Sequence, residues 1–206
     1  MSIIKGHLGA IYIATGAAQA ITDDATTANV AETEFVITDS DHRFLDPATA
    51  VVVEYNGSAV TTYATLQRPG GKVTWDTTPG AEAVTLSGAY IPVTELGEAR
   101  GWTLDTQWEF VDVSTFGDTF RVNEPTFRGA TVSIEHFYVD SSMFTIMSGG
   151  TVVGFDLFMD ATASSELRYT GFAYMSSQSI SAPVDGIIDE PLSLTVIDGP
   201  YYMAGL

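Results

Sequence analysis

The chain has 206 residues, 45% of them hydrophobic, which is enough for one domain with a sizeable core and argues against global disorder. Its 8 basic and 26 acidic residues give a net charge of −18, which excludes a basic nucleic-acid-binding surface. Cysteine is absent, so disulfides and thiolate metal sites are excluded too. No apolar run approaches the ~20 residues that span a bilayer, and we expect no membrane partner.

Short runs of Val, Ile, Thr, Tyr and Phe, bounded by Gly, Pro, Asn and Asp, predict antiparallel strands along most of the chain. Residues 8–14 are predicted to form the first strand rather than a cleaved signal peptide, because the apolar run is short and interrupted by glycine. Asn56-Gly57 lies between two strand-like runs and predicts a tight hairpin. A turn followed by a strand is predicted over 68–75, and a strand broken near Gly88 over 83–93.

Composition shifts mildly at two places, the acidic stretch 23–34 and the charged, glycine-containing stretch 95–101. The block of about four strands between them is predicted to be an insertion. We therefore expect residues 23–97 to form an inserted β module, and residues 1–22 with 98–206 to form the core domain.

Alternation is clearest over 102–113, where apolar and polar side chains fall on opposite faces and predict a half-buried strand. The apolar face carries Trp102, Leu104, Trp108 and Phe110, and the polar face carries Thr103, Asp105, Gln107 and Glu109. Residues 130–138 alternate in the same way, and residues 152–159 alternate less cleanly.

The best helix candidate is 140–148, with Asp140 or Ser141 as its cap and Gly149-Gly150 as its end. Its methionines and Phe144 fall at helical spacing and are expected in the core rather than around a cofactor.

Catalytic and metal-binding patterns find little support. None of the three histidines has a second histidine three or four residues on, so no local zinc pattern exists. His136 is expected to be a hydrogen-bonded core or interface residue. The acidic pairs at 23–24 and 39–41 lack the closing glutamate of a calcium loop and are expected to be solvated.

The segment VDVSTFGD (111–118) poses the remaining question. Asp112 and Asp118 could act as an acid–base pair only if the fold brought them together and separated their pKa values. Asp112 is instead expected to end a strand, with residues 116–118 starting an exposed loop. We therefore expect no catalytic residue, no metal and no cofactor, and hence no enzyme.

The stretch WTLDTQWEFVDVSTFGDTFRVNEPTFRGATVSIEHF (102–137) resembles the major tail protein of long-tailed bacteriophages, the tail tube subunit. The run AYMSSQSISAPVDGIIDEPLSLTVIDGP (173–200) is also similar to that family. The resemblance covers 98–206 well and 1–22 loosely, and 35–93 looks like a β module inserted in some tail proteins. The order of these motifs along one chain carries the resemblance, since each motif alone is weak.

The resemblance implies a mainly β fold: an antiparallel β-sandwich or barrel core with one flanking α-helix and a small inserted β module. It implies hexameric rings of identical subunits, stacked into a hollow tube that conducts DNA during ejection without binding it specifically. The other partners would be tail proteins such as the tape measure, the tail tip and the terminator. The protein would be made in the host bacterial cytoplasm and located in the virion.

Site residues follow from the resemblance together with the alternation. Polar residues on the wet strand faces would line the lumen and repel DNA, unless they form an ordinary solvent-exposed sheet face. These lumen candidates are Asp105, Gln107, Glu109, Thr131, Ser133 and Glu135. The loop 112–128 would contact the neighbouring ring, because three phenylalanines in a polar loop are unusual for a free surface. Its candidates are Asp112, Phe116, Asp118, Phe120, Arg121 and Phe127.

Two other functions stay open. A β-sandwich binding or decoration module could recognise carbohydrate or a cell surface through Trp75, Tyr90 or Tyr201-Tyr202, although these are expected to be packing residues. A hydrolase using paired carboxylates has the weakest support, since no acid–base constellation is visible.

Overall fold

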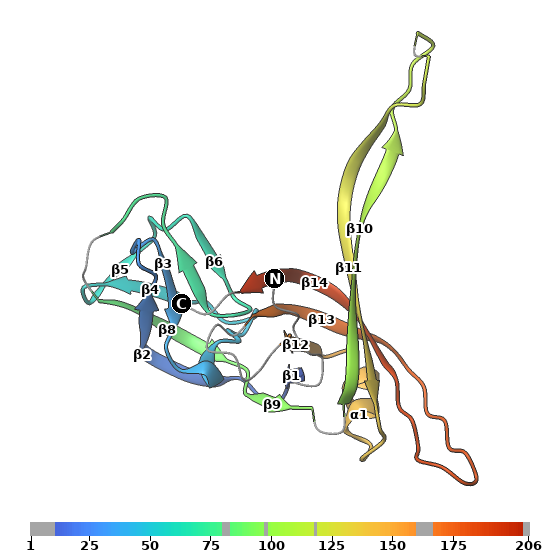
Figure 1. Cartoon of the computed structure of the whole chain (residues 1–206). Coiled ribbons are helices and arrows are strands. Elements are labelled where there is room, and N and C mark those ends of the chain that lie inside the picture. The colour runs from blue at the N-terminus through green and yellow to red at the C-terminus, as the bar shows by residue number, and fades with distance from the viewer. Residues whose placement is uncertain (1–10, 80–82, 97–98, 118, 160–166, 204–206) are drawn as a thin grey trace, which may run out of the picture. The chain divides into compact units, whose positions relative to one another are not determined.

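The computed structural model describes residues 11–79, 83–96, 99–117, 119–159 and 167–203 (Figure 1). The predicted fold class is confirmed: the described residues form antiparallel β-sheets and one α-helix. No helix in these ranges is long and apolar enough to cross a membrane.

The strands form two seven-stranded sheets. In spatial order, the first contains β10 (Ala99–Asp112), β11 (Asn123–His136), β14 (Leu192–Met203), β13 (Arg168–Gln178), β12 (Val152–Phe158), β1 (Ile11–Ala14) and β9 (Val93–Glu95). The second contains β5 (Ser58–Val60), β4 (Val52–Tyr55), β8 (Val84–Tyr90), β2 (Gln19–Ala28), β3 (Glu34–Ile37), β7 (Lys72–Thr74) and β6 (Thr65–Gln67).

The chain divides into two compact units. Unit 1 contains Met1–Ala99, Val152–Ala173 and Ile197–Leu206, and unit 2 contains Arg100–Thr151 and Tyr174–Val196. The predicted division into 1–22 with 98–206 and 23–97 stays a prediction; its first boundary falls within β2.

Within the described residues of unit 1, two apolar clusters stand out. One joins residues of the second sheet, including Phe35, Leu86 and Trp75, whose ring packs edge-on against Phe35 with centroids 5.2 Å apart. The other joins Ala14, Phe44, Ile91 and Phe172. β12 is buried on both faces, which explains why its sequence alternates poorly.

Local chemistry sets several turns as predicted. Asn56 and Gly57 both have positive φ, 50° and 70°, and connect β4 to β5 in a tight hairpin. The predicted break at Gly88 is wrong, because β8 runs through it. The irregularity lies in the partner strand β2, where the register shifts between Ile21 and Asp24.

The helix α1 (Ser142–Gly149) forms where predicted, but its predicted place in the core is wrong. Asp140 accepts a hydrogen bond from the Ser142 amide, and Gly150 ends the helix in the left-handed conformation. No residue of the helix is buried, and Phe144 is 54% exposed. Helical spacing defines an apolar face but does not supply a partner to cover it.

Candidate functional site

The long hairpin of unit 2 is built from β10 and β11, which have 14 residues each. Only the lower part of β11 has a second neighbour, since Thr131–Ile134 pair with Leu192–Thr195 of β14. We call this lower part, residues 130–136 of β11, the hairpin base. Residues 105–112 and 123–129 form the distal ribbon, and residues 113–122 form the tip.

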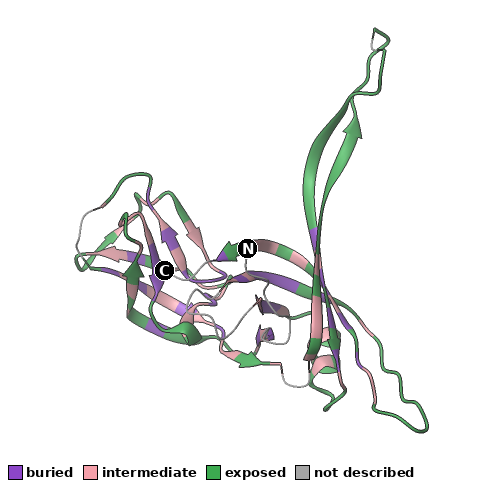
Figure 2. Cartoon of the chain, in the orientation of Figure 1, coloured by how far each residue is buried: buried purple, intermediate pink, exposed green. Residues whose placement is uncertain are grey.

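Burial changes abruptly between the base and the ribbon. In the base, Ala130, Val132, Ile134 and His136 are buried and alternate with more exposed residues. Every residue of the distal ribbon is exposed, as the uniform green of the hairpin's upper part shows (Figure 2). The prediction of a half-buried strand over 102–113 is therefore wrong beyond Leu104, because no third strand or second layer from the described part of the chain covers the ribbon.

The ribbon and tip expose large apolar side chains. The exposed fractions are 52% for Trp108, 62% for Phe110, 115% for Phe116, 83% for Phe120 and 73% for Phe127. A two-stranded hairpin is marginally stable alone, and contiguous exposed aromatic surface marks an interaction site. The hairpin therefore has the composition of an interface that lacks its partner in the isolated chain.

The tip is held by short polar contacts. Asp112 ends β10 as predicted, and its carboxylate accepts hydrogen bonds from the hydroxyl (2.5 Å) and amide (3.0 Å) of Ser114. These two bonds lower the pKa of Asp112. The Ser114 hydroxyl also accepts a hydrogen bond from the Val122 amide, which closes the turn. Arg121 lies 3.6 Å from Asp112, and Asp118 lies outside the described residues.

The lumen candidates differ in their surroundings. Ser133 and Glu135 are exposed and Thr131 is half-buried, and all three alternate with buried residues of β11. Asp105, Gln107 and Glu109 lie in the ribbon, where both faces are exposed. Burial therefore identifies one polar face at the base and none in the ribbon.

Strand pairing bears on whether the six lumen candidates share a face. The Val113 amide donates to the Val122 carbonyl, and the Thr126 hydroxyl donates to the Glu109 carbonyl. If this pairing continues without a register shift, Asp105 pairs with Ala130. Paired residues point to the same face of a hairpin, so Asp105, Gln107 and Glu109 share the face of Ala130. Thr131, Ser133 and Glu135 then lie on the other face. A shift of one residue would place all six on the same face.

A buried polar cluster fixes the base of the hairpin, as predicted for His136. Its Nδ1 lies 3.1 Å from Oε2 of Glu190, whose side chain is fully buried. The Gln178 amide donates to the other carboxylate oxygen of Glu190 at 2.5 Å. Arg100 pairs with Asp189 at 2.8 Å and stacks on Phe137.

The β13–β14 loop, residues 179–191, is a second exposed apolar element of unit 2 that sequence reasoning did not single out. Ile180 is 54% exposed, Val184 100% and Ile187 65%. Backbone bonds in both directions between Ser181 and Asp189 close the loop. Apolar residues flanking Pro183 and Gly186, both turn residues, were the available signal.

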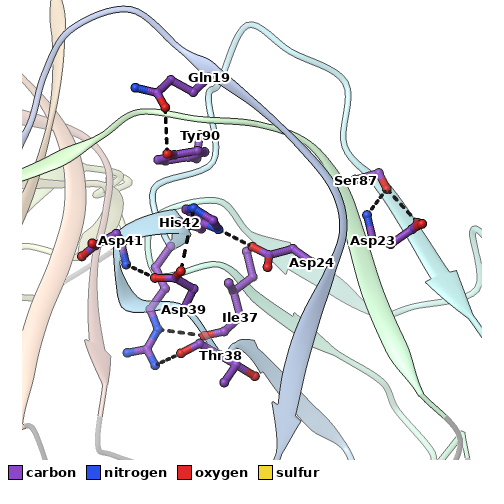
Figure 3. Close-up of polar contacts among 11 residues, drawn as sticks. Gln19, Asp23, Asp24, Ile37, Thr38, Asp39, Asp41, His42, Ser87 and Tyr90 are labelled. Atoms are coloured by element: carbon purple, nitrogen blue, oxygen red, sulfur yellow. Dashed lines mark hydrogen bonds and ion pairs between the residues drawn. The ribbon is translucent and has the colours of Figure 1, made fainter.

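The densest polar cluster of unit 1 surrounds His42 (Figure 3). Its Nδ1 lies 2.8 Å from Asp24, its Nε2 lies 3.9 Å from Asp39, and its ring packs on Tyr90. Asp39 caps a 3₁₀ turn (Ser40–His42) by accepting from the Asp41 amide. In the described ranges no three His, Cys, Asp or Glu residues are placed to hold a metal ion. The cluster ties β2 to the 3₁₀ turn.

The aromatic residues suggested for a carbohydrate- or cell-surface-binding site, Trp75, Tyr90 and Tyr201-Tyr202, mostly pack or form hydrogen bonds within the chain. Trp75 is buried, and the Tyr90 hydroxyl donates to Gln19. The Tyr201 hydroxyl donates to Asp198, whereas Tyr202 is 53% exposed beside Tyr169.

No protein-family model matches the chain, and no curated protein matches it. Two similar solved structures come from gene transfer agent (GTA) particles, each at 16% identity and a TM-score of 0.45. One is the tail of an empty particle with C6 symmetry, where the match covers 55% of this chain and 87% of that chain. The other is the virion of the native particle, with 54% and 89% covered.

Proposed function

We propose that this chain is a structural protein of a phage-type tail, the tube subunit, which assembles with copies of itself into stacked rings. The single observation that carries the assembly is the distal ribbon, which exposes Trp108, Phe110 and Phe127 on a two-stranded hairpin. The order of sequence motifs over 98–206 supports the identification of the assembly as a tail. The proposal includes hexameric rings, a virion location and no catalytic step.

The hairpin is proposed to contact the neighbouring ring. Its tip carries Phe116 and Phe120, which are among the most exposed side chains of the described residues. Burying an aromatic side chain of this kind on a second copy is worth roughly 1.5–3 kcal/mol. The ring-to-ring contact would therefore order a hairpin that the isolated subunit supports only at its base.

The polar face of the base is proposed to face the tube lumen. Thr131, Ser133 and Glu135 lie there, opposite the buried side chains of the same strand. Hydroxyl and carboxylate groups offer phosphate no attractive partner, and the net charge of −18 repels DNA in transit. Asp105, Gln107 and Glu109 join this lining only if the strand pairing shifts by one residue.

Negative-stain electron microscopy across a concentration series tests the proposal. Hollow tubes or stacked rings are expected above a threshold concentration. A chain that stays monomeric even with purified tail-tip complex added would overturn the tube assignment and favour the binding module, to be tested by glycan and cell-surface binding.

Replacing Phe116 and Phe120 with Ser tests the hairpin. Assembly should be lost while the melting temperature of the unassembled chain stays unchanged, because both side chains are fully solvated there. Tubes of normal length from this variant would refute the proposed role of the tip.

A further inference from the structure

We propose that the surface receiving the hairpin tip is the β13–β14 loop of a second copy of this chain, so that subunits join head to tail. The inference rests on the proposed function and deepens it by naming the contact partner. It follows from where the two exposed apolar elements of unit 2 lie and from their chemistry.

The tip and the loop lie at opposite ends of the same strand. β11 begins at the tip and ends at His136, whose carbonyl accepts from the Glu190 amide at the end of the loop. Phe137 and Asp189 form the next bridge, and the Tyr138 amide donates to the Ile188 carbonyl. The tip therefore cannot reach the loop of its own unit, and the two protrude at the two ends of β11 (Figure 1).

The two elements are chemically complementary. The tip offers Phe116 and Phe120, and the loop offers Val184 and Ile187, the latter pair 100% and 65% exposed. Aromatic and branched aliphatic side chains pack well against each other in the dry centre of an interface. Pro183 adds a rigid apolar surface to the loop that costs little conformational entropy to order.

Charge favours this pairing over a contact between two tips. Most basic residues of the described ranges have partners within their own unit, namely Arg43, Arg68, Lys72, Arg100 and Arg168. The hairpin carries the others: within the described ranges Arg128 is exposed and forms no ion pair, and the side chain of Arg121 is 84% exposed with one long ion pair. A contact between two tips would bring two Arg121 side chains together, whereas the loop presents the exposed carboxylate of Asp185.

The reach of the ribbon suits a contact between copies. Residues 105–112 extend about 26 Å beyond the base at the usual rise per residue of a strand. That length approaches the diameter of a small domain. A contact between two different surfaces, one at each end of the subunit, leaves a free surface of each kind after every addition. It therefore propagates as an open stack when the rotation between copies does not close a ring.

Complementation between two defective variants tests the inference. The tip variant replaces Phe116 and Phe120 with Ser, and the loop variant replaces Val184 and Ile187 with Asp. Each variant alone should need about tenfold or more higher concentration to assemble than the wild type. Val30→Asp is the matched control for the loop, since Val30 is also fully exposed, at 106%, and should assemble normally.

Mixing the two variants gives the decisive result, measured by sedimentation velocity and electron microscopy. The intact tip of the loop variant should dock on the intact loop of the tip variant. The free surfaces that remain are the substituted tip of one variant and the substituted loop of the other. Neither can bind a further copy, so assembly should stop after one contact. A mixture that behaves as the sum of its parts overturns the inference, as does a loop variant that forms normal tubes when the wild type does.

Cross-linking adds a direct readout, because the natural chain contains no cysteine. An equimolar mixture of Phe116→Cys and Val184→Cys chains, treated with a flexible bismaleimide, should give a covalent heterodimer in excess of either homodimer. Dominant Phe116→Cys homodimers would instead establish a tip-to-tip contact and refute the loop. If the wild type fails to assemble even with tail-tip complex, the proposed function and this inference fall together.

Discussion

The hairpin base and the distal ribbon belong to the same two strands but differ in what surrounds them. The base is joined by β14, which pairs with Thr131–Ile134, and by the buried His136–Glu190 pair. The ribbon continues the same hairpin, and among the described residues neither a third strand nor a second layer covers it. Identical secondary structure is therefore covered by other parts of the chain at the base and left exposed in the ribbon.

This difference shows what an alternating sequence does and does not encode. Alternation determines which side chains share a face, because successive residues of a strand point to opposite sides. Whether that face is buried depends on a third element, which the alternation itself does not contain. Trp108 and Phe110 continue the apolar face predicted from Trp102 onward, yet they are more than half exposed.

Hydrogen exchange should give the largest contrast between the two halves. In the unassembled chain, amides of residues 131–134 should exchange only by global unfolding, at about 5–15 kcal/mol, and those of the ribbon with opening free energies near zero. Mass spectrometry of peptides from the two halves measures this. Equal protection in the monomer would show that the ribbon is stable without a partner. Assembly should raise protection in the ribbon and leave that of residues 131–134 unchanged.

Truncating Glu190 should have the next largest effect. Glu190→Ala leaves the buried His136 and the half-buried Gln178 without their shared partner, which should lower the free energy of unfolding by about 3–5 kcal/mol. Arg121→Ala breaks the exposed ion pair of the tip and should lower the free energy of unfolding by only about 0–1 kcal/mol. Denaturant titration measures the free energy of unfolding of both variants. Similar losses of stability would contradict the proposed difference between the buried base and the exposed tip.

A pair of truncations within β11 sharpens the comparison further. Ile134 is 1% exposed, so Ile134→Ala should destabilise the subunit by about 2–5 kcal/mol through lost burial and the cavity left behind. Phe127→Ala removes a larger side chain that is 73% exposed and should change stability by about 0.5 kcal/mol or less. The order should reverse for assembly, where Phe127→Ala should be the more harmful of the two.

The smallest expected effect concerns the titration of the tip. Ser114→Ala removes the hydroxyl bond that contributes most to lowering the pKa of Asp112, so this pKa should rise toward its ordinary value. With the bond present, the ionised carboxylate stabilises the turn at pH values above the ordinary pKa of aspartate. This stabilisation is lost as the pH falls through the lowered pKa of Asp112. NMR titration measures the shift. Asp140, held similarly by Ser142, should not move.

Local chemistry made part of the fold predictable. Asn56-Gly57 specified a hairpin because few other residues adopt positive φ at both turn positions. The helix could be placed from Asp140 and Gly150, since its ends depend on neighbouring residues. Long-range pairing was not predictable in the same way. The acidic stretch after Thr22 has no local strand pattern, yet it continues β2 because β3 and β8 pair with it on either side.

The candidate site was predictable in position but not in extent. The phenylalanines of 112–128 stood out because their polar surroundings made them unusual, and the structure leaves them exposed. The β13–β14 loop was not predicted to be an exposed apolar element. Valine and isoleucine are usually buried, so residue type alone did not indicate that Val184 and Ile187 are exposed. The contact between His136 and Glu190 joins residues 54 apart in the chain, and no local pattern connects them.

Among the described strands, β10 lies at the end of its sheet and so has a neighbouring strand on one side only. An uncovered edge strand of 14 residues offers a row of backbone donors and acceptors to any extended segment it meets. Asp105, Glu109 and Asp112 place negative charge along that edge in every copy. Two such edges meeting side by side would oppose like charges, which disfavours edge-to-edge pairing between copies of the chain.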